Sequence, residues 1–147
     1  MTWLFLLHLF STAMMTGIIW FVQIVHYPLF TEVGSPGFSH FEAQHRAKTF
    51  WVVAPLMLLE LGTGLMLLFT RPVWLSSWMT WAGLLCLAAL WLSTFFIQVP
   101  LHARLDEGHQ PEVIQKLVQS NWIRTAIWSL RSLGGFCILF SQVSTGT

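Results

Sequence analysis

Four apolar stretches take up most of this chain, and each is about as long as an α-helix that crosses a membrane. Such a helix needs roughly 20 apolar residues. Hydrophobic residues make up 55% of the 147 residues and charged residues only 9%, whereas about a quarter of a soluble domain is normally charged. The sequence therefore predicts one all-α integral-membrane domain over residues 1–147, a four-helix bundle with helices at about 2–27, 40–70, 75–99 and 112–142.

The distribution of basic residues between the predicted loops indicates an orientation. One side of the bundle carries Arg46, Lys48, Arg104 and Lys116, and the other carries Arg71 and both termini. Because basic loops stay in the cytoplasm, we expect a multi-pass protein of the inner (cytoplasmic) membrane with both termini in the periplasm or its equivalent. The net charge of +1 excludes the basic surface that a nucleic-acid-binding protein needs.

Two charged residues lie deep inside apolar stretches. Glu60 is in the second predicted helix and Arg131 in the fourth. A charge at such a depth is costly unless it meets a partner or serves a ligand. We therefore predict a structural ion pair between Glu60 and Arg131 that fixes the second helix against the fourth. The alternative is a relay for protons or substrate that includes Arg124, seven residues before Arg131, with Glu60 as a candidate catalytic residue.

The two halves of the chain resemble each other at an offset of about 71 residues. A glutamine, a Pro-Leu pair and a glycine recur in the same order, and Trp51 before Glu60 corresponds to Trp122 before Arg131. This pattern favours two repeated helical hairpins. At the start of the second helix, Ser39 and Glu42 have the spacing of a capping box.

Histidines gather on the basic side of the predicted bundle. His26 ends the first helix, His45 lies in the opening turns of the second, and His102 follows the third. Neutral imidazole is the commonest metal ligand. We therefore predict a metal site of His26, His45 and His102 with Glu42 as a fourth ligand, holding iron, copper or zinc. The alternative cofactor is haem b between two of these histidines.

The second half also resembles a known family. Its Pro-Leu-His and Asn-x-x-Arg-Thr segments resemble the Pro-Leu-Asn and Asn-x-x-Arg-Thr pattern of a bacterial four-helix membrane family of unknown function that is related to the anthrone oxygenases. The resemblance implies the four-helix fold and makes Pro100, Asn121 and Arg124 family positions. His102 replaces the usual asparagine of the family, which strengthens the expectation of a metal or haem.

These observations lead to a function hypothesis with a rival. The first reading is an integral-membrane redox or oxygenase-like protein in which Arg124 and Asn121 orient a lipophilic, carbonyl-bearing small molecule beside the histidines. The rival is a non-enzymatic accessory or scaffold subunit of a larger membrane complex, or a homo-oligomer. In both readings the expected surroundings are membrane lipid.

Overall fold

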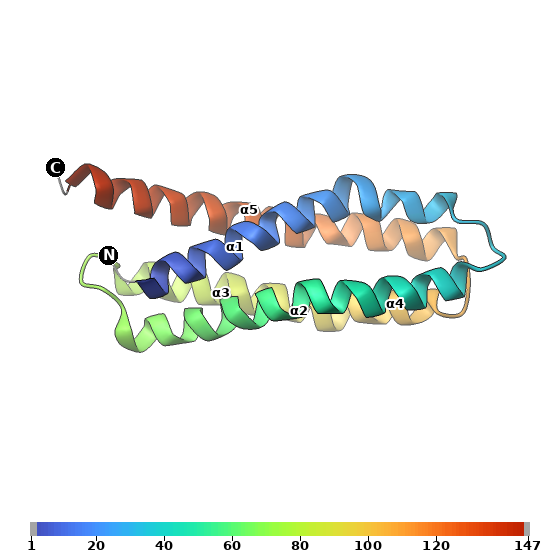
Figure 1. Cartoon of the computed structure of the whole chain (residues 1–147), viewed down its shortest axis with the longest axis horizontal. Coiled ribbons are helices and arrows are strands. Elements are labelled where there is room, and N and C mark those ends of the chain that lie inside the picture. The colour runs from blue at the N-terminus through green and yellow to red at the C-terminus, as the bar shows by residue number, and fades with distance from the viewer. Residues whose placement is uncertain (1–2, 146–147) are drawn as a thin grey trace.

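The computed structural model describes residues 3–145, and these residues form helices joined by short loops, with no β-strand among them (Figure 1). The first helical segment consists of α1 (Trp3–Phe21), the π-helical turn η1 (Val22–His26) and the 3₁₀ turn η2 (Pro28–Glu32). The others are α2 (Phe38–Thr70), then α3 (Ser77–Ser93) with the π-helical turn η3 (Thr94–Gln98) and α4 (Val99–Leu105), and last α5 (Pro111–Thr145).

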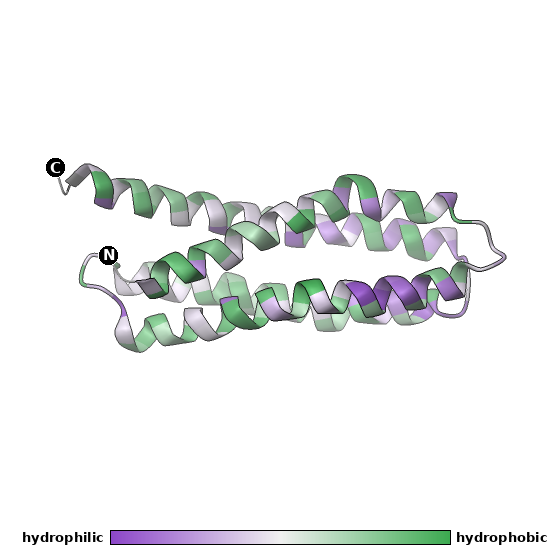
Figure 2. Cartoon of the chain, in the orientation of Figure 1, coloured by the Kyte–Doolittle hydropathy of each residue, from purple (hydrophilic) through white to green (hydrophobic). Residues whose placement is uncertain are grey.

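These segments give four helices that are long and apolar enough to cross a membrane. They confirm the predicted all-α four-helix membrane architecture. One end of the bundle, here called the loop end, holds the connections at residues 33–37 and 106–110. The opposite end, here called the terminal end, holds both chain ends and the connection at residues 71–76. Figure 2 shows that hydrophilic residues gather towards the loop end.

The interior is made by residues of all four helices. Met15 of α1, Met57 of α2, Leu87 of α3 and Trp128 of α5 are all buried within the same hydrophobic cluster. Many tryptophan, phenylalanine and leucine side chains face outwards instead, among them Trp51, which is 75% exposed. An apolar exterior of this kind suits lipid, because in a bilayer there is no water to drive such side chains inwards.

The structure corrects the predicted end of the third helix. It was predicted to end at about residue 99, just before Pro100, but the helical path continues through η3 into α4 and stops at Leu105. A proline ring clashes with the carbonyl four residues earlier in a regular α-helix. The π turn just before Pro100 widens the helix by one residue and removes the need for a break. The turn η1 stands in the same relation to Pro28, so both halves share this local feature, as the predicted repeat requires.

The predicted capping box at the start of α2 is wrong. The helix begins at Phe38, after Gly37, whose φ of 96° only glycine adopts without strain. Among the described residues no side chain caps this end. Glu42 is instead fully buried and contacts His102 of α4, because a tertiary partner binds its carboxylate more favourably than a half-solvated helix end would.

Candidate functional site

The three histidines predicted to converge do meet at the loop end. His26 comes from η1, His45 from the second turn of α2 and His102 from the first turn of α4. The ring centroids of His26 and His45 are 4.7 Å apart, and those of His45 and His102 are 5.2 Å apart. Tyr27 directly follows the π turn of η1 and lies in the same cluster, with its ring centroid 6.2 Å from that of His45 and 5.6 Å from that of His102.

Hydrogen bonds organise this cluster into two units. In the first, Nε2 of His26 lies 2.8 Å from Nδ1 of His45, which is also 3.1 Å from the Thr49 hydroxyl. In the second, Nδ1 of His102 lies 2.6 Å from a carboxylate oxygen of Glu42, and Nε2 of His102 lies 3.0 Å from the Tyr27 hydroxyl.

The second unit is a carboxylate–imidazole–phenol relay. An ionised Glu42 can only accept a hydrogen bond, so Nδ1 of His102 carries the hydrogen. In the neutral ring, Nε2 is then an acceptor and takes the hydrogen of the Tyr27 hydroxyl. A buried carboxylate that orients an imidazole towards a hydroxyl is the arrangement by which catalytic triads make a hydroxyl a proton donor or acceptor. We call Glu42, His102 and Tyr27 the relay.

The residues of the predicted metal site lie close together, but their side chains are not arranged to coordinate a metal. Within residues 3–145 no group of three histidine, cysteine or acidic side chains is placed to hold a metal ion. Nε2 of His26 and both nitrogens of His102 are engaged in hydrogen bonds. A bis-histidine haem would need the porphyrin plane between two imidazoles, whereas His26 and His45 touch directly. The described residues therefore show no group arranged for a metal, and the metal and haem sites stay predictions.

A cavity of about 1000 Å³ lies beside the relay, between α2 and the α3–η3–α4 segment. Most of its wall is apolar, with Met57, Val53 and Phe95 among the lining residues. Its polar lining side chains gather towards the loop end: Tyr27, Ser39, His45, Arg46, Thr49, Thr94, Gln98, His102, Asp106 and Arg124. An apolar cavity with a few convergent polar groups is the usual form of a small-molecule site.

Three polar atoms on this wall have no hydrogen-bond partner in the described chain: Oε1 of Gln98, Nε of Arg124 and Nε1 of Trp91. The amide of Gln98 has a defined direction. The Ser120 hydroxyl donates to the Leu117 carbonyl, so its oxygen accepts from Nε2 of Gln98 at 3.0 Å. Buried polar groups without partners are costly, so these three residues of the cavity lining are the candidates to bind a polar group of a ligand.

Asn121 lies behind the cavity wall and acts on Arg124. Its side chain is fully buried, donates to Oε1 of Gln23 at 3.0 Å and accepts from Nη1 of Arg124 at 3.3 Å. The Arg124 guanidinium also lies 5.2 Å from the centre of the Trp128 ring and close to the Tyr27 phenol. The candidate catalytic pair is thus split: Arg124 lines the cavity, and Asn121 positions Arg124.

Glu60 and Arg131 form the predicted ion pair, with Nη2 of Arg131 2.9 Å from Oε1 of Glu60. The Glu60 carboxylate is fully buried and also accepts from the Thr12 hydroxyl at 2.7 Å and from the Trp128 indole at 3.1 Å. Its two oxygens are therefore occupied by protein donors. Glu60 is not among the residues that line the large cavity, which favours the structural reading over the catalytic one.

Sequence reasoning missed the role of Tyr27 and that of Trp91. Tyr27 was not among the predicted site residues, although it is the single tyrosine of the chain and adjoins a candidate histidine. That combination was the available signal. Nothing in the sequence distinguishes Trp91 from the other eight tryptophans, because only packing shows that its indole nitrogen is buried.

No family model matches this chain, and no significant similarity to a curated protein or to a solved structure is found.

Proposed function

We propose that this protein is a membrane enzyme that removes a proton from a lipophilic carbonyl compound bound in the large cavity and promotes its reaction with oxygen. The observation that carries the proposal is the relay of Glu42, His102 and Tyr27, of which His102 and Tyr27 line that cavity. In this proposal the relay supplies the base, and Arg124 stabilises the negative charge that forms on the substrate.

Proton abstraction is the step that the relay supports. The Tyr27 oxygen, after passing its hydrogen to His102, can take a proton from a C–H bond next to a carbonyl. The negative charge then develops on the carbonyl oxygen of the substrate. A buried guanidinium that already has a fixed position stabilises such an oxyanion without reorganisation. Nε of Arg124, free of a protein partner among the described residues, is the donor that would do so.

The unpaired atoms of the cavity define the substrate class. A ligand that satisfies them carries a carbonyl oxygen for Arg124 and a hydroxyl group for Oε1 of Gln98, on an apolar frame. Hydroxylated aromatic ketones have this composition. Because the cavity opens between helices whose outer faces are apolar, we propose that the substrate enters from the lipid.

The oxygen step needs no added reductant. The carbanion formed from a CH₂ group reacts with O₂ to give a hydroperoxide, and loss of water from it leaves a second carbonyl. One CH₂ and one O₂ thus become one C=O and one H₂O. The resemblance of the Asn121–Thr125 segment to the family related to the anthrone oxygenases supports this reaction class. The basic residues at the loop end support an orientation in which that end faces the cytoplasm of a bacterial inner membrane.

Turnover of anthrone, used as a probe ketone with an acidic CH₂ group, tests the proposal. Purified protein in lipid nanodiscs is mixed with anthrone, and oxygen uptake and anthraquinone formation are measured above the spontaneous rate. Removing a general acid–base group typically costs 10²–10⁴-fold in rate. We therefore expect His102→Gln to lower the protein-dependent rate by about 10²-fold or more.

The matched control is His40→Gln. His40 is exposed, lies two residues before Glu42 on α2 and does not line the cavity. It should keep the full rate. Equal rates for the two variants, or a wild-type rate no faster than the spontaneous reaction of anthrone and of a hydroxylated anthrone, would contradict the proposal.

A further inference from the structure

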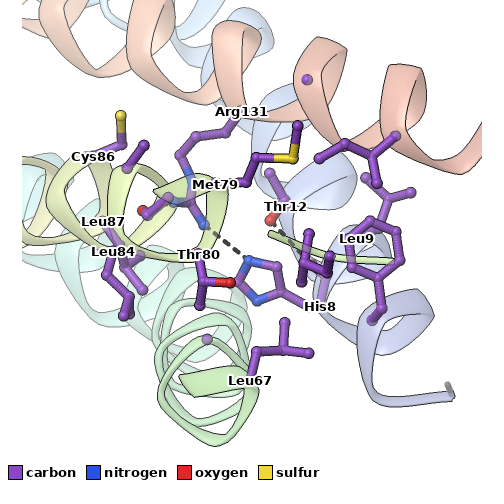
Figure 3. Close-up of a pocket in the computed structure, with 18 of the residues that line it drawn as sticks. His8, Leu9, Thr12, Leu67, Met79, Thr80, Leu84, Cys86, Leu87 and Arg131 are labelled. Carbon is purple, nitrogen blue, oxygen red and sulfur yellow. Dashed lines mark hydrogen bonds between the residues drawn. The ribbon is translucent and has the colours of Figure 1, made fainter. Parts of the chain in front are cut away.

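A second cavity, of about 430 Å³, lies at the terminal end of the bundle and is separate from the relay (Figure 3). It is bounded by α1, α2, α3 and α5, and most of its lining is apolar, as Figure 3 shows for Leu9, Leu67 and Met79. Small residues create the space, because Gly83 of α3 and Gly134 of α5 stand where larger side chains would fill it.

One charged group lies in this cavity, the guanidinium of Arg131, whose side chain is only 5% exposed. Its protein partners can be counted. Nε and Nη2 donate to Glu60 at 3.2 and 2.9 Å, Nη2 also donates to Nε2 of His8 at 3.1 Å, and Nη1 donates to the Gly83 carbonyl. A guanidinium has five N–H donors. One N–H of Nη1 is therefore left without a partner in the described chain, on a side chain that lines the cavity.

The neighbouring polar groups are already satisfied. Because arginine can only donate, Nε2 of His8 accepts from it and Nδ1 carries the hydrogen. Nδ1 donates to the Thr63 hydroxyl at 2.9 Å, and that hydroxyl donates to the Leu59 carbonyl at 2.7 Å. The imidazole is thus neutral, and its two nitrogens are both used within the protein.

The charge of the site decides the charge of its ligand. Glu60 neutralises Arg131 at 2.9 Å, and His8 is neutral in this hydrogen-bond pattern. An anion in the cavity would have to compete with the Glu60 carboxylate for the same guanidinium, at a buried position where repulsion is poorly screened. The site therefore favours an uncharged ligand.

We infer that the terminal-end cavity is a second binding site, which takes a neutral lipophilic molecule with one hydrogen-bond acceptor oxygen, such as an aromatic ketone. The oxygen accepts the free N–H of Arg131, and the rest of the molecule fills the apolar space left by Gly83 and Gly134. The volume lies within the range of about 300–1000 Å³ typical of small-molecule sites.

Photolabelling with benzophenone tests this site. Benzophenone is an uncharged ketone that, when illuminated, bonds covalently to C–H groups beside it. Labelled residues of the full-length protein in nanodiscs are identified by mass spectrometry. We expect label on Met79, Leu130 or Ile138, which line the small cavity. Label on the large cavity serves as an internal reference.

Filling the cavity should remove this label alone. A Cβ at Gly83 would lie 3.9 Å from Nη1 of Arg131, in ordinary contact, so Gly83→Leu places a side chain beside the free N–H. Gly134→Leu is the second variant, since a Cβ there meets nothing within 4 Å. Gly62→Leu is the control, on exposed α2 surface outside the cavity and also without a clash. We expect at least tenfold less label at the terminal end in a folded Gly83 or Gly134 variant, about the effect of 1.4 kcal/mol, and unchanged label in the control.

Competition between the photolabel and unlabelled molecules distinguishes a site that recognises an acceptor oxygen from a groove that any apolar chain can fill. Fluorene has the shape of fluorenone without the oxygen. At equal concentration in the bilayer, fluorenone should compete about tenfold better than fluorene, the size expected for a hydrogen bond to a charged donor. Equal competition would overturn the assignment in favour of unselective occupation by apolar chains. Label at the terminal end that persists in both filled variants would overturn the site itself.

Discussion

The ion pair of Glu60 and Arg131 gives the largest stability effect that the structure predicts. The side chain of Glu60 is fully buried, that of Arg131 is 5% exposed, and two hydrogen bonds join them. Arg131→Gln removes both bonds and leaves a buried carboxylate with two neutral donors, Thr12 and Trp128. Breaking one partner of a buried pair typically costs 3–5 kcal/mol. We expect the free energy of unfolding to fall by about that amount.

Reversible unfolding in mixed detergent micelles, followed by far-ultraviolet circular dichroism, measures this loss. The double variant Glu60→Gln with Arg131→Gln leaves no uncompensated charge, so its loss should be smaller than that of either single variant. Arg71→Gln is the control: Arg71 is exposed at the terminal end, where substitutions usually change stability by less than about 0.5 kcal/mol. A loss below about 1 kcal/mol for Arg131→Gln, or additive losses in the double variant, would refute the reasoning.

Three further predictions concern the large cavity. Asn121→Ala removes the side-chain oxygen that accepts a hydrogen bond from Arg124. We expect kcat for anthrone to fall about tenfold, the effect of 1.4 kcal/mol, while KM changes little. An unchanged kcat in a folded variant would mean that Arg124 needs no positioning. Ala54→Trp places a large ring in the cavity lining and should abolish saturable anthrone binding, measured by equilibrium partition into nanodiscs; retained binding would place the substrate elsewhere. Prolonged treatment with a strong chelator should leave the anthrone rate unchanged, because Nε2 of His26 and both nitrogens of His102 are used in hydrogen bonds. Loss of the rate, with recovery on adding one metal, would restore the predicted metal site.

The architecture and its deepest contact could be predicted because strong energetic terms set them. The length of an apolar stretch is fixed by the bilayer, and a charge within it must find a partner. Those two constraints were enough to pair Glu60 with Arg131 across the bundle. Helix ends were predicted less well, since the continuation of the third helix past Pro100 depends on a π turn that local patterns do not reveal.

Part of the candidate site could be predicted because the lengths of the apolar helices fix the level at which their ends lie. Helix ends at one level place His26, His45 and His102 near one another, and the structure brings them together. The direction of each imidazole nitrogen is set by rotamers and by partners on other helices, and these decide between a metal site and a hydrogen-bonded relay. Glu42 and Tyr27 illustrate this point: Glu42 was assigned to a helix cap and to the metal site, Tyr27 was assigned no site role, and both bind His102.

Hydrogen exchange at the CH₂ group of anthrone, in deuterated buffer without oxygen, tests proton abstraction by the relay most directly. It isolates the first step from the reaction with O₂ and is followed by proton nuclear magnetic resonance. Wild-type protein should accelerate the exchange, and Tyr27→Phe, which removes only the phenol oxygen beside His102, should lower the acceleration by about 10²-fold or more. An equal acceleration by wild type and Tyr27→Phe would contradict the account.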